Sequence, residues 1–382
     1  MRLSLLSSAF VAALIGYSAS VAIVLAAARS LGATPTETAS WLLAICLAKA
    51  AAGAWLSWHA RVPVLIAWST PGAALIASSE GIDLAHGVAA FMLTGGLIVI
   101  TGTWKAFGRL IANIPDTIAA GMLAGVLLPF CLTLPAAAID MPATVLPMIV
   151  IFVLIRLWNP AFAVLAALGL GILAAFLSGA ITTVEVPSGL PALTIIRPEF
   201  NLTALIGLGL PLYLVTMASQ NLPGFAVLRA AGYEPPVRPA LITTGGLSAL
   251  TAFFGAHTIS MAALTAAICL GDDTHPDRRQ RWKVGLFYAF LWALLGLFGG
   301  LLLTLIEALP PAYLTALVAL AMLNPLLGAA TGAFAREDQR FAALVTLAIT
   351  ASGTGIFGIG AAFWGLMAGL AIHVLDRWKA WQ

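Results

Sequence analysis

The stretches IAWSTPGAALIAS, from Ile66 to Ser78, and FGAHTISMAALTAAI, from Phe254 to Ile268, decide the fold of this chain. In each, a few residues suited to extended backbone lead into small polar residues and then into a short alanine-rich run that favours a helix. Backbone can be irregular at membrane depth only where protein or a wet cavity satisfies its polar groups. Because the two stretches occupy matching positions in two halves, they predict the substrate site of a secondary transporter.

The composition indicates an integral membrane protein. Of the 382 residues, 61% are hydrophobic and 9% are charged, and the mean hydropathy is +1.03. A soluble domain carries about 25% charged residues. In the first apolar run, from Leu3 to Ala28, no small-residue cleavage site precedes a soluble chain. We therefore interpret this run as a first span and not as a removed signal peptide.

Residues for covalent chemistry or metal binding are scattered along the chain. Three cysteines (Cys46, Cys131 and Cys269) lie in or beside apolar runs. Their odd number and their spacing indicate neither a disulfide framework nor a metal site. The five histidines do not cluster, and no nucleophile–base pair or cofactor motif is evident. We expect no metal, no cofactor and no enzymatic activity.

Apolar runs broken by proline, glycine or charge predict an all-α polytopic membrane protein with fourteen segments. Several segments are too short to span a membrane alone. The predicted segments are 6–28, 40–58, 64–79, 86–104, 116–133, 143–156, 160–178, 201–221, 239–252, 254–270, 284–306, 311–330, 339–351 and 358–375.

The basic residues predict the orientation of these segments. With the N-terminus inside, only Arg29 and Arg197 of the 18 Lys and Arg fall outside, and Lys49 lies within a span. Such an asymmetry is what the positive-inside rule requires, and it places both termini in the cytoplasm. The residues placed inside are Arg2, Arg61, Lys105, Arg109, Arg156, Arg229, Arg238, Arg278, Arg279, Arg281, Lys283, Arg336, Arg340, Arg377 and Lys379.

The two halves of the chain, 1–190 and 200–382, resemble each other. YSASVAIVLAAARSLGATP, starting at Tyr17, aligns with MASQNLPGFAVLRAAGYEPP, starting at Met217, at an offset of 200. The two interrupted stretches align at an offset of 189, which pairs Trp68 with His257. Because each half has seven segments, matching motifs end on opposite sides of the membrane. The sequence therefore predicts an inverted repeat.

Each interruption supplies candidates for helix capping and for anion binding. Ser69 or Thr70 can cap the helix that follows, and Thr258 or Ser260 is expected to do the same in the second half. Inverted symmetry then directs two helix N-termini at each other near the middle of the membrane. Their free N–H groups and positive dipole ends suit a small anion. Ordinary kinks patched by serine and threonine are the alternative.

His257 is predicted to stand immediately before the second short helix. An ionisable residue at membrane depth is a functional hypothesis by default. Its ordinary pKa lies near 6.5, so we predict that it carries the proton if transport is proton-coupled. A structural histidine bonded to a backbone carbonyl is the alternative. Lys49, in the middle of its span, suits a structural pairing and a direct ionic role equally well.

Further substrate-binding candidates come from the segment after residue 201. Gln220 and Asn221 suit the orientation of a carboxylate or carbonyl group, although hydrogen bonding between helices is an alternative of about 0.6 kcal/mol each. Trp68 flanks the first interruption and suits a planar or aromatic substrate. The predicted substrate-binding set is Ser18, Ser20, Trp68, Ser69, Thr70, Ser219, Gln220, Asn221, Ala256, His257 and Thr258.

The chain resembles the benzoate membrane transport family, the BenE-type benzoate:proton symporters, along essentially its whole length. The likeness is carried by GYSASVAIVLAAARSLGATP, IAWSTPGAALIA, IPDTIAAGMLAGVLLPF, ASQNLPG and AFFGAHTIS. More distantly it is similar to the uracil/xanthine permease and anion-exchanger superfamily. Where uracil-type permeases have acidic residues, this chain has Ser219 and His257, and the absence of both acids fits an anionic substrate.

The resemblance implies a seven-plus-seven inverted repeat in which two broken segments, each a short strand plus a half-helix, cross at the substrate site. It implies a core domain (1–110 and 200–306) that moves against a gate domain (111–190 and 307–382). The expected activity is import of benzoate or a related aromatic carboxylate with a proton, across the inner membrane of a bacterial cell. A carrier for another small anion or a nucleobase, and an anion channel, are the alternatives. The expected partners are the substrate, a proton and the lipid bilayer, with no nucleic acid; formation of a homodimer is left open.

Overall fold

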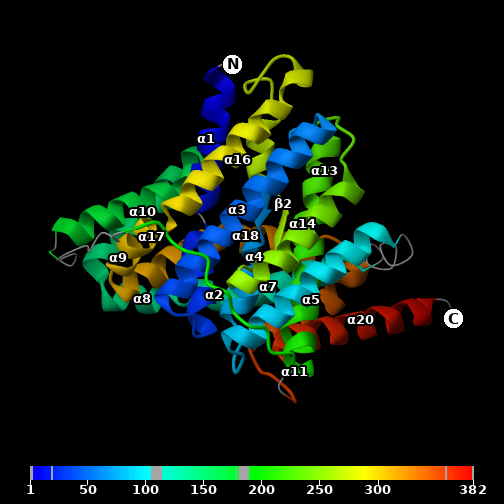
Figure 1. Cartoon of the computed structure of the whole chain (residues 1–382). Coiled ribbons are helices and arrows are strands. Elements are labelled where there is room, and N and C mark those ends of the chain that lie inside the picture. The colour runs from blue at the N-terminus through cyan, green and yellow to red at the C-terminus, as the bar shows by residue number, and fades with distance from the viewer. Residues whose placement is uncertain are drawn as a thin grey trace.

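A computed structural model of the protein describes residues 3–18, 20–104, 114–177, 179, 189–357 and 359–380. Most of these residues are helical, and the sheet within them consists of two short strands (Figure 1). The predicted positions of Arg2, Lys105 and Arg109 lie outside the described residues. The first half contains α1 (Leu3–Ser18), α2 (Val21–Ser30), α3 (Pro35–Ala60), β1 (Ile66–Trp68), α4 (Thr70–Ala77), α5 (Leu84–Thr103), α7 (Asp116–Leu132), α8 (Leu134–Asp140), α9 (Pro142–Trp158) and α10 (Pro160–Leu177).

The second half begins with one long helix in which α-helical and π-helical turns alternate. It comprises α11 (Leu202–Ala204), the π-helical η1 (Leu205–Gly209), α12 (Leu210–Thr216), the π-helical η2 (Met217–Asn221) and α13 (Leu222–Ala230). The rest contains α14 (Val237–Thr251), η3 (Ala252–Phe254), β2 (Ile259–Met261), α15 (Leu264–Cys269), η4 (Arg278–Gln280), α16 (Trp282–Leu297), α17 (Gly299–Glu307), α18 (Pro311–Ala333), η5 (Glu337–Gln339), α19 (Arg340–Ala351) and α20 (Ala361–Ala380).

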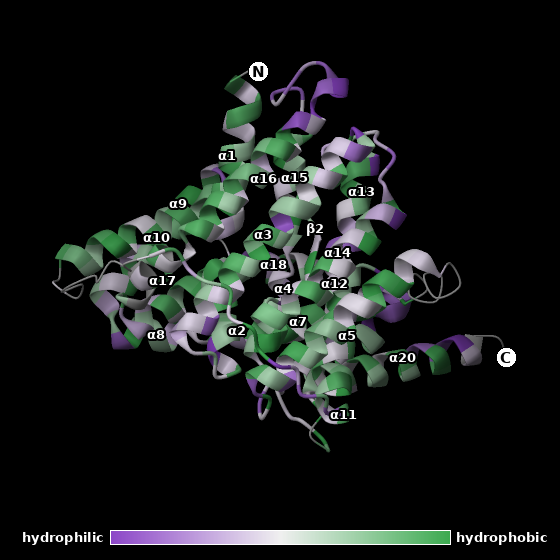
Figure 2. Cartoon of the chain, in the orientation of Figure 1, coloured by the Kyte–Doolittle hydropathy of each residue, from purple (hydrophilic) through white to green (hydrophobic). Residues whose placement is uncertain are grey.

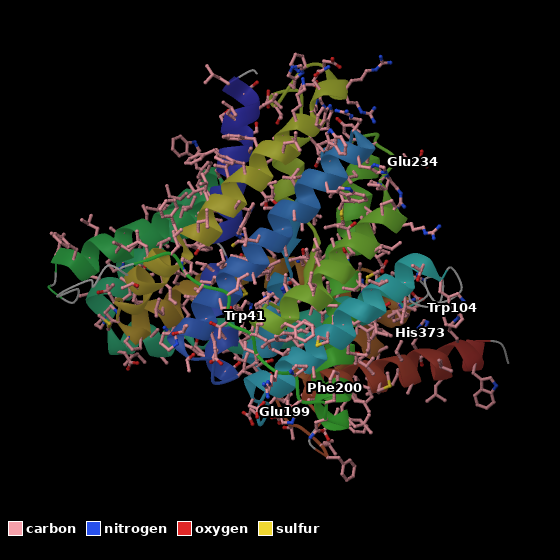
Figure 3. All side chains as sticks on the ribbon, in the orientation of Figure 1. Trp41, Trp104, Glu199, Phe200, Glu234 and His373 are labelled. Atoms are coloured by element: carbon pink, nitrogen blue, oxygen red, sulfur yellow. The ribbon has the colours of Figure 1, made fainter. Side chains whose placement is uncertain are left out.

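Apolar residues dominate the helices, as a membrane environment requires. Within the described residues, six helical stretches are long and apolar enough to cross a membrane. Figure 2 shows hydrophobic residues along the middle of the helices and hydrophilic residues gathered in the connecting loops and near helix ends. Glu199 and Glu234, one at each end of the α11–α13 helix, lie at opposite ends of the molecule in Figure 3. The protein is therefore a multi-pass membrane protein.

Local sequence explains where several helices begin. Thr34 and Glu37 form a reciprocal capping box at the start of α3, where the Thr34 hydroxyl and the Glu37 carboxylate each accept a hydrogen bond from the other residue's backbone N–H. Asp83 caps α5 by accepting from the backbone N–H of His86. This N–H lowers the pKa of the Asp83 carboxyl below its ordinary value.

The two halves end their first long helix in the same way. After α2, Gly32 adopts a φ of 75° and its N–H donates to the carbonyl of Arg29. After α13, Gly232 adopts a φ of 78° and its N–H donates to the carbonyl of Arg229. Glycine takes this left-handed conformation without steric cost, which explains why it follows both helices. The four residues are those paired by the offset of 200 in the sequence.

The helices pack in two groups. In one, α3 lies against α14 and α16, α14 against α5, and α2 against α4. In the other, α7 lies against α18, α19 and α20, and α9 lies against α10. Figure 1 shows α9 and α10 on one side of the molecule, with α3, α16 and the strands near its centre.

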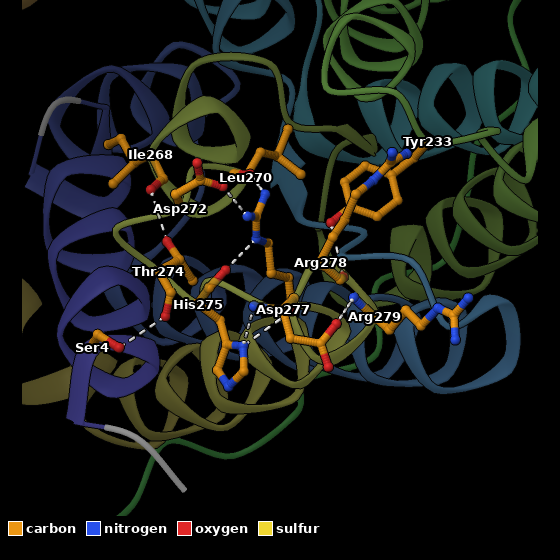
Figure 4. A network of polar contacts seen from close by, with 11 residues as sticks. Ser4, Tyr233, Ile268, Leu270, Asp272, Thr274, His275, Asp277, Arg278 and Arg279 are labelled. Carbon is orange, nitrogen blue, oxygen red and sulfur yellow. Dashed lines mark hydrogen bonds and ion pairs between the residues drawn. The ribbon is translucent and has the colours of Figure 1, made fainter.

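The loop between α15 and α16 is held by a network of polar contacts (Figure 4), several of which Arg281 makes. The Arg281 guanidinium donates to the carbonyls of Leu270 and His275 and pairs with Asp272. Thr274 accepts a hydrogen bond from Ser4 at its carbonyl, which ties this loop to α1. These contacts hold together the charged loop from Asp272 to Arg281.

Candidate functional site

Two antiparallel strands form the centre of the candidate site. β1 and β2 pair Ile66 with Met261, Ala67 with Ser260 and Trp68 with Ile259. Two flanking hydrogen bonds extend the ribbon, from the Ser69 N–H to the Thr258 carbonyl (2.9 Å) and from the Ala262 N–H to the Leu65 carbonyl (2.9 Å). Because the strands are antiparallel, α4 and α15 continue from opposite ends of this ribbon.

The start of α4 agrees with the sequence prediction. The Ser69 hydroxyl accepts a hydrogen bond from the Gly72 N–H at 3.1 Å and so caps the helix. Pro71 stands in the first turn, where its missing N–H costs nothing. Thr70 is the first residue of the helix. It is half-buried, and within the described residues its hydroxyl takes part in no hydrogen bond.

The start of α15 corrects three expectations. Its N-cap residue is Ala263, which has no side-chain cap, so neither Thr258 nor Ser260 plays that role. His257 does not stand immediately before this helix, because β2 and a turn separate it from Leu264. The offset of 189 pairs Trp68 with His257, and this pairing is also wrong. Trp68 is the last residue of β1, and the last residue of β2 is Met261. Thr258 and Ser260 are residue types that often cap a helix, which explains the prediction. The β-branched Ile259 between them favours extended backbone, so residues 259–261 form a strand instead.

Three hydroxyl groups from three segments meet beside the ribbon. The Thr216 hydroxyl donates to the Ser69 hydroxyl and contacts the Thr258 hydroxyl, each at 3.0 Å, and all three residues are fully buried. Sequence reasoning missed Thr216. Its position one residue before the polar MASQN stretch was the available signal. This cluster joins α12 to both interrupted stretches.

His257 is fixed by hydrogen bonds at both ring nitrogens. Nδ1 accepts from the indole N–H of Trp41 at 3.0 Å, and Nε2 lies 3.2 Å from the carbonyl of Ser69. An indole can only donate and a carbonyl can only accept, so the imidazole is neutral with its hydrogen on Nε2. A second proton on Nδ1 would face the Trp41 N–H. Figure 3 shows Trp41 in the middle of the molecule, consistent with its full burial.

The polar residues of η2 differ in their surroundings. The Asn221 side chain is fully buried, accepts from the Met261 N–H at 3.0 Å and donates to the sulfur of Met217. The Ser219 hydroxyl donates to the carbonyl of Val215. Gln220 is half-buried, and its amide makes no hydrogen bond to any described residue. A π-helical turn often marks a functional position, and here it carries Gln220.

Ser18 and Ser20, in the first segment, also differ in their hydrogen-bond partners. The Ser20 hydroxyl accepts from the indole N–H of Trp68 at 2.6 Å and donates to the carbonyl of Gly16. The Ser18 hydroxyl donates only to the carbonyl of Ile15, within its own helix. Ala256 is fully buried. The structure therefore brings Ser69, Thr258 and His257 together, connects Ser20 to Trp68, and leaves Thr70 and Gln220 with polar groups available to a ligand.

A cavity of about 370 Å³ lies between α2, α7 and α18. Its lining is mostly apolar and includes Ala22, Phe130 and Val318, with Arg29, Thr133 and Thr315 as polar members. No group of three or more His, Cys, Asp or Glu side chains among the described residues is placed to hold a metal ion.

Comparison with known proteins gives a consistent result over the whole chain. The family described as BenE, benzoate membrane transport protein, matches residues 1–375. Inner membrane protein YdcO of Escherichia coli is 40% identical over 372 residues, which cover 97% of this chain and 95% of that protein. A benzoate membrane transport protein of Acinetobacter baylyi is 33% identical over 380 residues, which cover 99% of this chain and 96% of that protein.

Solved structures share the fold at low sequence identity. The transmembrane domain of the cyanobacterial bicarbonate transporter BicA superposes with a TM-score of 0.63 at 15% identity and covers 97% of this chain and 98% of its own. SLC26A9 superposes with a TM-score of 0.69 at 15% identity, covering 97% of this chain and 65% of its own. At this level of identity the similarity establishes the fold alone.

Proposed function

This chain belongs to the benzoate membrane transport protein family, whose members are transporters and not enzymes, and from this premise we propose that it imports benzoate or a closely related aromatic carboxylate. The observation that carries the proposal is the family match over residues 1–375. The mostly apolar cavity beside α2 supports it, because its lining offers apolar surface for an aromatic ring. We place the protein in the bacterial inner membrane with both termini in the cytoplasm.

We propose that the substrate binds beside the β1–β2 ribbon, between it and α7. α4, α12 and η2 all contact α7. Thr70 and Gln220, on α4 and η2, carry polar groups that no described residue satisfies. A ligand between these elements and α7 would meet the Thr70 hydroxyl and the Gln220 amide.

The proposed architecture is the seven-plus-seven inverted repeat with a core and a gate domain. The matching turns at Gly32 and Gly232 support the repeat, since equivalent sequence adopts equivalent backbone in both halves. The two groups of packed helices support the division into domains, because α7 packs against α18, α19 and α20, and α19 packs against α20. In an elevator-type cycle the first group would carry the substrate past the second.

We propose that a proton accompanies the substrate. Benzoate is an anion at neutral pH, and an inside-negative potential opposes its entry by about 2.3 kcal/mol per 100 mV. One proton cancels that charge. The role of His257 as the proton carrier stays a prediction, and its two hydrogen bonds favour a positioning role instead.

Uptake of labelled benzoate into proteoliposomes tests the proposed function. We expect accumulation when the outside is more acidic than the inside, and little uptake when the gradient is abolished by an uncoupler. Empty liposomes are the control. Excess unlabelled bicarbonate tests the alternative that another small anion is carried. Saturable uptake also excludes a channel.

Gln220→Ala and Asn221→Ala should separate binding from folding. The Asn221 variant leaves the Met261 N–H without its buried acceptor, so we expect a loss of about 1–3 kcal/mol of stability. The Gln220 variant should change stability by less than about 0.5 kcal/mol and weaken benzoate binding. Thermal unfolding in detergent and calorimetric titration measure the two effects. Unchanged affinity in Gln220→Ala would place the substrate elsewhere.

Cysteine labelling tests the proposed topology. In a variant with Cys46, Cys131 and Cys269 replaced, single cysteines at Asp83 and Asp140 should react with an impermeant thiol reagent added outside intact cells. Single cysteines at His275 and Arg336 should react only after the membrane is opened. Labelling from the opposite side at two of these four positions would refute the fourteen-segment arrangement.

A further inference from the structure

Lys49 is buried in an aromatic cluster at the centre of the protein. The side chain lies in the middle of α3 and is 2% exposed. Its Nζ atom lies 4.3 Å from the ring centroid of Trp68 and 2.7 Å from that of Trp292. Tyr17 contacts both indoles, with ring centroids 5.7 and 5.9 Å away, and Tyr288 contacts Trp292. We call Tyr17, Trp68, Tyr288 and Trp292 the aromatic box.

The aromatic box contains donors that lack acceptors. Within the described part of the chain, Lys49 forms no ion pair and its Nζ atom makes no hydrogen bond. The Tyr17 hydroxyl and the Trp292 indole N–H are also buried without a hydrogen-bond partner. A buried polar group without a partner costs free energy, and a buried charge costs more. Contact with ring faces offsets only part of that cost for an ammonium.

A carboxylate is the chemical complement of this cluster. It offers acceptors to an ammonium, a phenol hydroxyl and an indole N–H at once, and charge-assisted hydrogen bonds of this kind are the stronger ones. An aryl group attached to the carboxylate could stack on the surrounding rings. The box adjoins the candidate site, because Trp68 belongs to β1 and donates a hydrogen bond to Ser20.

We propose that Lys49 binds the substrate carboxylate inside the aromatic box and carries the transported proton. This inference rests on the proposed function and names the coupling group. As the carboxylate enters, the Lys49 amine takes a proton from a hydronium ion on the outer side. One O–H bond breaks to leave water and one N–H bond forms, which gives a neutral ammonium–carboxylate pair. On the inner side the carboxylate leaves and the proton returns to water. Each ligand stabilises the other, so proton and anion binding are reciprocally coupled.

The surroundings of Lys49 suit this exchange. The titratable groups that act on Lys49 are Cys46 from its own helix and, at longer range, His257. Tyr17 from α1 and Tyr288 from α16 contact the indoles that surround Lys49. None of them is a carboxylate, and none of the described acids pairs with Lys49. A permanently charged lysine would need such an acid. The missing counter-charge is therefore the one that the substrate supplies.

Calorimetric titration with benzoate in two buffers of different ionisation enthalpy tests the proposal. The wild type should take up about one proton per benzoate bound. Lys49→Met should bind at least about tenfold more weakly and take up no proton. Lys283→Met, which removes an ammonium at the start of α16, is the matched control and should behave as the wild type. Proton uptake that persists in Lys49→Met, or is absent from the wild type, overturns the proposal.

Two further variants keep the test decisive if Lys49→Met does not fold. Lys49→Arg keeps a charge that cannot be released, so it should bind benzoate without proton uptake and should not accumulate it under a pH gradient. Tyr17→Phe removes a hydroxyl without a partner, so it should keep its thermal stability and lose affinity severalfold. Unchanged affinity in Tyr17→Phe together with normal accumulation by Lys49→Arg contradicts the proposal. If the wild type neither binds nor transports benzoate, it is the proposed function that fails.

Discussion

His257→Phe is expected to be among the most damaging single substitutions in this protein. It leaves the Trp41 indole N–H without its acceptor in a fully buried site, and it removes one of the two hydrogen bonds at the Ser69 carbonyl, which also accepts from the Ala73 N–H. The unpartnered indole N–H costs about 1–3 kcal/mol, and the lost bond to the Ser69 carbonyl adds about 0.5–1.5 kcal/mol. Because Ser69 caps α4 and its N–H pairs with Thr258, the loss falls on the ribbon itself. Thermal unfolding in detergent and the level of protein in the membrane measure it.

His257→Gln is the informative companion to this substitution. Glutamine retains one donor and one acceptor, so it can keep the bond to Trp41 or to Ser69, and we expect a smaller loss of stability. If His257 serves to position the ribbon, the variant should still accumulate benzoate under a pH gradient. Normal benzoate binding combined with complete loss of accumulation would instead identify His257 as the proton carrier and would oppose the assignment to Lys49.

Gly245→Leu is expected to prevent stable folding, whereas Gly246→Leu is expected to be tolerated. A Cβ atom at Gly245 would lie 2.7 Å from the Gly95 carbonyl oxygen and 2.8 Å from the Val99 nitrogen, both backbone atoms of α5. Backbone cannot move aside without separating the helices, so a loss of more than about 3 kcal/mol is expected. At Gly246 no atom lies within 4 Å of the added Cβ.

Gly245→Leu and Gly246→Leu form a matched pair of variants, because the two glycines are adjacent on α14 and the substitution is identical. Leucine improves helix propensity over glycine by about 1 kcal/mol, so the Gly246 variant should be as stable as the wild type or slightly more stable. Separation of α14 from α5 should also disturb the candidate site. The Ser248 hydroxyl of α14 accepts a hydrogen bond from the Ile259 N–H and so anchors β2. Equal loss in both variants would show that α5 and α14 do not approach as closely as described.

Much of the fold was predictable from the sequence because it depends on local chemistry. Apolar runs define the membrane helices, since lipid leaves no other way to satisfy the backbone. The cap formed by Ser69, with Pro71 behind it, and the left-handed turns at Gly32 and Gly232 follow from the conformational preferences of single residues. The family resemblance carried by the quoted motifs is confirmed by the match over residues 1–375.

Other features depend on contacts between distant segments and could not be obtained from the sequence. The second interruption reads as a cap followed by a helix, but pairing with β1 makes residues 259–261 a strand and moves the helix start to Leu264. Thr216 joins the site only because α12 passes both interruptions.

The sequence by itself determined which residues are polar in an apolar chain, because membrane burial makes every such residue conspicuous. Only the tertiary structure decided which of them are already satisfied. Asn221 and His257 have buried partners brought by other segments, whereas Gln220 has none among the described residues. Lys49 is the clearest case. Its position in the middle of a span suited two roles equally, and only the structure shows that it lies among aromatic rings and hydrogen-bond donors, with no acid paired to it among the described residues. A hydrogen bond needs two groups, and only the fold brings the second one into reach.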